Sequence, residues 1–292
     1  MVDRPQSFLR RDVLALSAFS ALDVALLGGC NNNSKESEAV ASEAVDLALG
    51  FVERDVPQLR AGLPDSVKVL LKRLPTDPVG SREELQTAIK AARENTNDLA
   101  FSKITFLSYA TAEGVVLRSE AGSDNLADQN IVKVFPALAK AHEQPGSLAE
   151  AYGEMDALRG VHNGADTAWV VATSVPSDDP KKPRGLFIAG WSFRLYARSL
   201  QDGSRNKYGE KIKGKVLPLI YIYILKGTGA YGDPDAPDVN ADELVKLKAL
   251  DGALKGEFRT NREIEKRTFG IVAKKAPLLG EDAAIAAVAS VF

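Results

Sequence analysis

The sequence predicts an α+β fold in which N-terminal helices precede one or two units, each an antiparallel sheet with flanking helices. Three observations lead to this prediction. The first third of the chain places apolar residues at helical spacing. From residue 104 onward, short apolar runs rich in Val, Ile and aromatic residues alternate with Gly-rich or polar turns, which is typical of strands. Two blocks of this second part also repeat a broadly similar order of strands, turns and a helix.

Three helices are expected ahead of the first strand. Residues 37–56 place Val, Ala, Leu and Phe at helical spacing, and Pro57 is expected to interrupt or end this helix. Residues 66–74 predict a second, short helix. A third helix is expected to run from Ser81 to about Glu94, because Ser81-Arg-Glu-Glu84 has the pattern of a capping box.

The first block begins with a predicted hairpin, in which strands 104–110 and 115–118 flank a turn that ends in glycine. Short helices are expected at 131–141 and at 148–158. The apolar runs 167–175 and 185–193 predict two further strands, followed by a helix near 194–201.

The second block begins with a predicted strand at 217–225 and a Gly-rich turn at 226–229. An amphipathic helix is expected at 241–254, where four leucines share one face. Three more strands are predicted, at 257–260, 267–274 and 283–291. The similar order of elements in the two blocks suggests an internal duplication.

Residues 8–30 have the composition of an export signal. Arg10 and Arg11 precede a mostly apolar segment that ends in two glycines and Cys30, the only cysteine in the chain. The apolar segment is shorter than the ~20 residues of an ordinary membrane span. The alternative is a buried N-terminal helix that contains these residues by chance.

Two short motifs in this segment resemble known signals. The run LRRDVL resembles the twin-arginine export motif, and LGGC resembles the bacterial lipobox, in which the cysteine is lipidated and becomes the first mature residue. Asn31 follows the cysteine and is not the aspartate that retains lipoproteins at the inner membrane. The resemblance therefore implies a lipoprotein on the periplasmic face of the outer membrane.

Composition limits the function classes. The whole chain has 37 Lys and Arg against 39 Asp and Glu and no basic stripe, which argues against nucleic acid as the main partner. Removal of residues 1–29 leaves 263 residues, enough for one large or two small domains. If Cys30 is lipidated, no disulfide is possible, and stability has to come from the core.

The run ITFLSYATAEGVVLRSEAGSDNLADQNIVKVFPALAKA resembles the core of Cache domains, the extracytoplasmic sensor relatives of PAS domains. The strands TAWVVATSV and GLFIAGWSF resemble the last two sheet strands of that family. The resemblance covers residues 98–200, and 217–292 more weakly as a second PAS-like unit. It implies a small ligand, an amino acid, carboxylate or amine, in a pocket between the curved sheet and its loops.

The resemblance also implies a division of the chain. Residues 1–29 are the signal peptide, 30–97 a tether and helical region, 98–213 a first Cache-like unit with its connecting helix, and 214–292 a second PAS-like unit. Most Cache domains are followed by a membrane helix and a signalling module, whereas nothing follows Phe292 here. Any signal is therefore expected to leave through an envelope or sensor-kinase partner.

Four aromatic residues on predicted strands, and an arginine just past one of these strands, are the candidate ligand-binding residues. In a PAS-like pocket, an arginine with two or three aromatic rings suits a carboxylate or ammonium group. The alternative is ordinary core packing. These residues are Trp169, Trp191, Arg194, Tyr221 and Tyr223.

Other chemistry has weaker signals. The only histidines, His142 and His162, lie twenty residues apart in polar surroundings and are expected at the surface, so no metal site is predicted. No G-x-S-x-G motif occurs. Gly227-Thr-Gly229 lacks the GK[ST] of a phosphate-binding loop and is expected to be a turn. Three carboxylates in 233–238 suit either a weak calcium site or a solvated loop.

The sequence therefore favours a non-enzymatic, lipid-anchored, Cache-like sensory or ligand-binding protein without a cofactor. One alternative is a structural or interaction module of the cell envelope, which a structure without a cavity beside Trp169 and Trp191 would favour. Another is an exported hydrolase that uses dispersed residues, because twin-arginine substrates are usually exported already folded.

Overall fold

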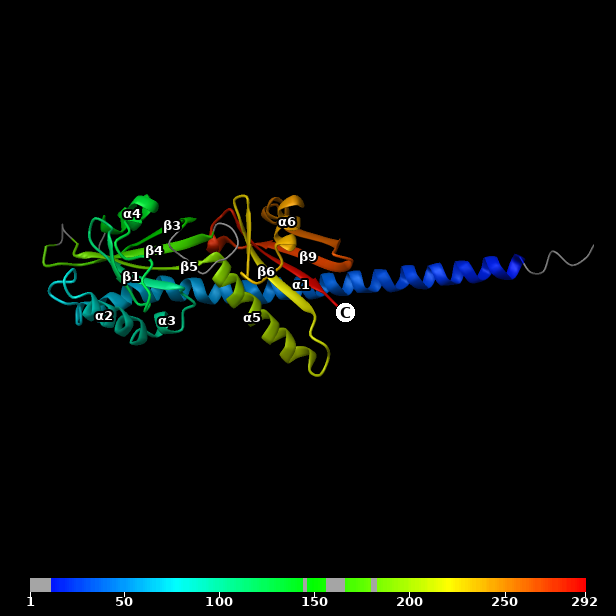
Figure 1. The fold of residues 1–292 in the computed structure, drawn as a ribbon, viewed down its shortest axis with the longest axis horizontal. Coiled ribbons are helices and arrows are strands. Elements are labelled where there is room, and N and C mark those ends of the chain that lie inside the picture. Colours follow the sequence, from blue (N-terminus) through cyan, green and yellow to red (C-terminus); the bar gives the residue numbers. More distant parts are fainter. Residues whose placement is uncertain (1–11, 144–145, 156–165, 180–182) are drawn as a thin grey trace, which may run out of the picture.

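The predicted α+β fold is confirmed. The computed structural model describes residues 12–143, 146–155, 166–179 and 183–292, with the backbone alone for 12–31. One long helix is followed by two five-stranded antiparallel sheets with flanking helices, a double PAS-like arrangement (Figure 1). The long helix runs along both sheets.

The long helix, α1 (Asp12–Leu71), carries the shared core. Buried residues recur every three or four positions along it, so one stripe of the helix faces the sheets over its whole packed length. This stripe consists of Ser37, Val40, Ala41, Ala44, Val45, Ala48, Val52, Asp55, Val56, Leu59, Leu63, Ser66, Val67 and Leu70. Its C-terminal part packs against the first sheet and its middle part against the second.

The break expected at Pro57 is wrong, because α1 continues through Pro57 and Pro64. Pro57 lies on the exposed side of the helix. Its ring removes a backbone hydrogen bond there without disturbing the buried stripe, whose packing holds the helix together. Residues 66–71 thus belong to α1 rather than to a separate helix.

The first sheet has the strand order β2-β1-β5-β4-β3, and all its neighbouring strands are antiparallel. Its strands are β1 (Phe106–Ala110), β2 (Val116–Ser119), β3 (Leu148–Glu154), β4 (Thr167–Val175) and β5 (Gly185–Ser192). The predicted hairpin joins β1 to β2, and Gly114 adopts the left-handed φ of +85° that the turn requires.

The second sheet repeats that arrangement, with the order β7-β6-β10-β9-β8. Its strands are β6 (Leu219–Lys226), β7 (Gly229–Gly232), β8 (Glu257–Ile264), β9 (Arg267–Lys275) and β10 (Ala283–Ser290). Strands one to five of each unit therefore occupy equivalent places, which is the relationship that an internal duplication predicts.

Short helices flank the sheets, and α5 connects them. The helices are α2 (Arg82–Glu94), α3 (Asn97–Ala100), α4 (Ile131–Val134), η1 (Pro136–His142), α5 (Phe193–Ile212), α6 (Asp238–Lys246), α7 (Ala249–Leu254) and η2 (Pro277–Leu279). Residue Ser81 precedes α2 as predicted, but its side chain makes no capping hydrogen bond.

Three other expectations need correction. Residues 148–154 form β3 rather than a helix, because seven consecutive residues pair with β4. The helix expected at 241–254 is two helices, divided at Lys248, whose φ is +53°. The helix expected at 131–141 is also divided, at Phe135-Pro136.

Strand alternation gives each sheet two buried faces. In β10, Ala283, Ile285 and Ala287 face the common core with α1. Residues Ala284 and Ala286 face a second core under α6 and α7. The first sheet is arranged in the same way, with one face on α1 and the other under the segment 120–143, which includes η1.

The N-terminal backbone continues α1 through Cys30, and Arg10 and Arg11 lie outside the described residues. Within the parts of the chain that the structure describes, no helix combines the length and the hydropathy needed to cross a membrane.

Candidate functional site

The face of the first sheet that points away from α1, here called the covered face, carries alanines beside larger apolar residues such as Val170, Leu186 and Ile188. Five alanines project from it: Ala110, Ala149, Ala151, Ala168 and Ala172. Larger apolar residues close it from above, among them Ile131, Phe135 and Leu138. Where the alanines lie, larger side chains of the covering segment can approach the sheet closely.

Three buried polar atoms at this face have no hydrogen-bond partner. By strand alternation, Ser108 on β1 and Ser174 on β4 point to the covered face, and both hydroxyl oxygens are buried and unpaired. The Nδ1 atom of His142, at the end of η1, is likewise unpaired, while its Nε2 lies 2.9 Å from the Ala112 carbonyl oxygen. An unpaired buried group costs about 1–3 kcal/mol, which a ligand or water recovers by bonding to it.

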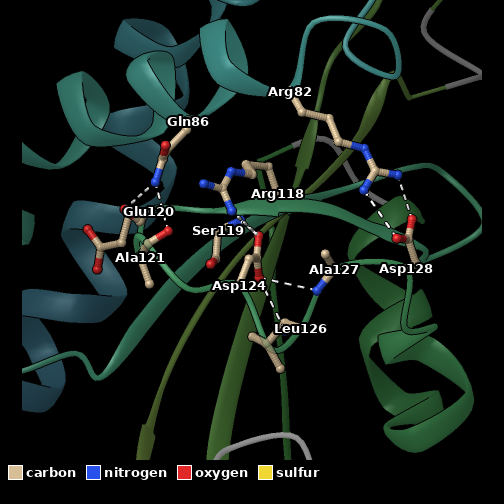
Figure 2. A network of polar contacts seen from close by, with 10 residues as sticks. All are labelled: Arg82, Gln86, Arg118, Ser119, Glu120, Ala121, Asp124, Leu126, Ala127 and Asp128. Atoms are coloured by element: carbon tan, nitrogen blue, oxygen red, sulfur yellow. Dashed lines mark hydrogen bonds and ion pairs between the residues drawn. The ribbon is translucent and has the colours of Figure 1, made fainter.

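The loop that begins the covering segment is organised by one carboxylate (Figure 2). Asp124 is nearly buried and accepts hydrogen bonds from the Arg118 guanidinium at 3.2 Å and from the Ser119 backbone N–H at 2.5 Å. It also accepts from the backbone N–H groups of Leu126 and Ala127, each at 3.2 Å. Four bonds to one side chain fix the path of residues 119–127.

Helix α2 holds this loop from outside. The Arg82 guanidinium bonds both carboxylate oxygens of Asp128, at 3.1 and 2.5 Å, and this pairing lowers the pKa of Asp128 (Figure 2). The Gln86 amide donates to the carbonyl oxygens of Glu120 and Ala121. Arg93 pairs with the Glu120 carboxylate, whose pKa is nevertheless raised, because burial outweighs the pairing.

Trp169 and Trp191 lie on the opposite face of the first sheet, toward α1. Both side chains are fully buried, and their ring centroids are 4.6 Å apart. The Trp169 indole N–H donates to Glu150 at 3.0 Å, and Glu150 also forms a bidentate pair with Arg60 of α1. The indole N–H of Trp191 is buried without a partner.

Arg194, Tyr221 and Tyr223 gather elsewhere, near the start of α6. The Tyr223 hydroxyl donates to the Pro237 carbonyl oxygen at 3.3 Å, and burial raises the pKa of Tyr223 well above its usual value. An Arg194 guanidinium nitrogen lies 3.9 Å from Asp238. Tyr221 is partly buried in the same core as Tyr223. The structure therefore divides the five predicted ligand-binding residues between two places.

A groove of about 630 Å³ lies where the two units meet, and we call it the junction groove. Its walls include 134–137, 150–152 and 280–282, with Lys226 from the second unit. The Lys226 ammonium lies 4.1 Å from the centre of the Tyr152 ring and also pairs with Asp282. Glu150 lines this groove and accepts the hydrogen bond from the Trp169 indole N–H. This one side chain therefore connects the groove to the tryptophan pair.

The weaker sequence signals are resolved as follows. Asp233 and Asp235 both bond Arg198. Over the described ranges, no three His, Cys, Asp or Glu side chains are placed to hold a metal ion together. Residues 227–228 form the turn between β6 and β7, as expected. His162 lies outside the described residues.

Ser108 and Ser174 are not among the residues that the sequence predicts to bind a ligand. Each is a polar residue whose neighbours two places away are apolar or small: Phe106 and Ala110 around Ser108, and Ala172 and Pro176 around Ser174. That pattern marks a polar group on a buried face, and it is the signal that identifies them.

No family model matches the chain, and no curated protein matches it. Solved structures do. The sensory domain of the Campylobacter jejuni chemoreceptor Tlp3 with isoleucine bound has 12% identity and a TM-score of 0.46, covering 89% of this chain and 93% of that one. The ligand-binding domain of the Pseudomonas aeruginosa PAO1 amino acid chemoreceptor PctB in complex with L-Arg has 13% identity and a TM-score of 0.46, covering 88% and 94%.

A domain of a putative sensory box/GGDEF family protein from Vibrio parahaemolyticus has 10% identity and a TM-score of 0.49, covering 87% of this chain and 97% of that one. Each TM-score is below 0.5.

Proposed function

We propose that this chain is an extracytoplasmic, non-enzymatic sensory module of the Cache type that binds a small molecule between the covered face and the segment 120–143. The observation that carries the proposal is the pair of buried, unpaired hydroxyls of Ser108 and Ser174 on an otherwise apolar face. A ligand with polar and apolar parts satisfies both features at once.

The chemistry of the face suits a small organic ligand. Serine hydroxyls donate and accept hydrogen bonds, so they suit amino acids, carboxylates or amines alike. The alanine methyl groups suit an apolar side chain. The covering loop is held by Asp124 and by α2, so it is already ordered before a ligand binds. Binding therefore costs less conformational entropy.

In this proposal, a structural change caused by the ligand can be transmitted to the second unit. Chain segment 131–142 covers the proposed site, and its residues 134–137 also line the junction groove. A ligand that shifts this segment therefore acts on the contact between the units. The receiver is an envelope or sensor-kinase partner.

The location is part of the proposal. Arg10 and Arg11 direct export through the twin-arginine pathway, and residues 1–29 are removed. Cys30 is then lipidated and anchors the mature chain at the periplasmic face of the outer membrane. Residues 98–213 and 214–292 form the two sensory units.

Thermal-shift screening of purified residues 31–292 tests the binding proposal. The panel contains amino acids, organic acids, amines and purines, with divalent metals as a separate arm. We expect one ligand class to raise the melting temperature by several degrees, because a ligand that binds only the folded state stabilises it by RT ln(1 + [L]/Kd). A flat screen on protein that melts cooperatively would overturn the proposal.

A second candidate is an envelope interaction module without a ligand. The observation that favours it is the packing of Trp169 and Trp191, which are fully buried with their ring centroids 4.6 Å apart. Capture of a specific envelope protein, together with a flat ligand screen, would establish this alternative. A hydrolase using dispersed residues would instead show turnover that one serine or carboxylate substitution abolishes.

A further inference from the structure

One end of the second sheet exposes apolar and basic side chains together. Lys213, Lys215, Val216 and Leu217 are exposed in the connection between α5 and β6. Val216 is 75% exposed and Phe292, which follows β10, is 68% exposed. Large apolar side chains with this much exposure usually mark a surface that contacts something else.

The strand register brings these residues to one place. In the β6–β10 ladder, Ser290 pairs with Leu219, so continuing that antiparallel register brings Phe292 opposite Leu217. The Arg267 guanidinium, at the start of β9, lies 5.4 Å from the centre of the Phe292 ring. We call the set Lys213, Lys215, Val216, Leu217, Arg267 and Phe292 the basic–apolar surface.

Helix α1 points from this surface toward Cys30. The Val291 backbone N–H donates to the Ser37 hydroxyl at 3.2 Å, so α1 passes the end of β10 at Ser37. Cys30 is seven residues earlier, which is about 10 Å along a helix. Figure 1 shows that the N-terminal part of α1 projects from the same end of the second sheet where β10 ends and β6 begins.

We propose that the basic–apolar surface rests on an anionic membrane surface, with Val216, Leu217 and Phe292 at the level of the headgroups. The proposal rests on the lipid anchor at Cys30, which would hold this end within about 10 Å of the bilayer. Lysines and arginine beside exposed apolar residues match the composition of interfacial contacts. The neighbouring β8–β9 turn adds Glu265 and Lys266, whose charges cancel.

Such contact would fix the orientation of the second unit relative to the membrane. The anchor alone tethers a single point and leaves the sheet free to rotate. Three apolar side chains and three cations, where β6 and β9 begin and β10 ends, would hold this end of the sheet against the membrane. The first unit, at the far end of α1, would then project away from the membrane.

The experiment uses residues 30–292, in which Cys30 is the only cysteine and can be coupled to a maleimide lipid in vesicles. This chain contains every buried residue in the part whose side chains the structure describes, the first of which is Ser37. The vesicles contain phosphatidylglycerol and phosphatidylcholine with brominated acyl chains, which quench nearby tryptophan fluorescence. The native tryptophans are fully buried and give a constant background.

Two variants are compared, Phe292→Trp and the matched control Phe101→Trp. Phe101 is 73% exposed but lies after α3, beside the first unit. We expect more than half of the added fluorescence to be quenched in Phe292→Trp and little in Phe101→Trp. Lys213→Glu with Lys215→Glu should remove most of that quenching, because each lysine near an anionic surface contributes about fivefold in binding.

Two results would overturn the proposal. Equal quenching at both positions would mean that the protein lies on the membrane without a preferred face. No quenching at either position, in variants that melt like the parent protein, would leave the basic–apolar surface as a contact for another protein. Because coupling is chemical, neither result depends on lipidation in the cell, which mass spectrometry of Cys30 tests separately.

Discussion

Trp191 and Tyr196 stack nearly parallel, with ring centroids 4.1 Å apart and ring planes inclined by 9°. Trp191 belongs to β5, the central strand of the first sheet, and Tyr196 belongs to α5, the helix that leads to the second sheet. The Tyr196 hydroxyl continues the contact to α1 by donating to the Asp55 carboxylate at 3.1 Å. Three elements of the fold therefore meet at one stack of rings.

Substitution Tyr196→Phe tests this meeting point. The variant keeps the stacked ring but removes a donor to a buried carboxylate, so we expect the free energy of unfolding in urea to fall by about 1–3 kcal/mol. Tyr208→Phe, at a partly buried position of the same helix, is the control and should change it by less than about 0.5 kcal/mol. Equal effects would show that the Asp55 hydrogen bond has no special weight.

Substitution Gly270→Ala tests the contact between α1 and the second sheet. An added Cβ would lie 2.2 Å from the Glu38 backbone nitrogen, so helix or strand must move. We expect a loss of about 3 kcal/mol in the free energy of unfolding. Gly50→Ala is the control on α1, where an added Cβ meets nothing within 4 Å. It should stabilise by about 0.5–1 kcal/mol, and a destabilising Gly50→Ala would contradict the packing described.

Substitutions Ser108→Ala and Ser174→Ala test the proposed binding face. Neither hydroxyl has a partner, so removal should leave the free energy of unfolding without ligand unchanged or raise it slightly. Calorimetric affinity for a ligand found by screening should fall roughly two- to tenfold for each variant. Ser199→Ala on α5 is the control. Unchanged affinity in both variants would place the ligand elsewhere.

Substitution Asp166→Asn tests a buried carboxylate. Burial raises the pKa of Asp166 above its ordinary value of 3.8, so ionisation is less favourable in the folded chain than in the unfolded one. Its contribution to stability is therefore full below pH 3.8 and is lost as the pH rises through the raised pKa. The melting temperature of Asp166→Asn relative to the parent should increase with pH above 3.8. A constant difference would contradict this.

Most elements could be predicted from the sequence because their patterns are local. Eight of the ten strands in the described residues were predicted from their apolar runs, and hairpins such as β1–β2 carry a glycine where the turn needs it. Strand β7 was not predicted, because its four residues include two glycines. Strand β3 could not be predicted, because Leu148–Glu154 is rich in Ala and Glu, which favour helix. Its strand conformation comes from pairing with β4, a contact with residues about twenty positions away.

The candidate site was harder to predict because it depends on which face of a strand is covered. Alternation in β4 shows that Trp169 and Val170 point in opposite directions, but the sequence does not say which direction meets α1. Trp169 and Trp191 face α1. Tyr221 and Tyr223 instead lie in the core under α6 and α7. Whether any of the five predicted residues binds a ligand stays a prediction.

Hydrogen–deuterium exchange with the most stabilising compound of the thermal-shift panel is the most direct test of the central claim, that a small molecule binds between the covered face and segment 120–143. We predict slower amide exchange in 120–143 and in β1 and β4 when the compound is present, and little change in α6 and α7. Unchanged exchange in 120–143, with protection confined to 150–152 and 280–282 on the other walls of the junction groove, would contradict it.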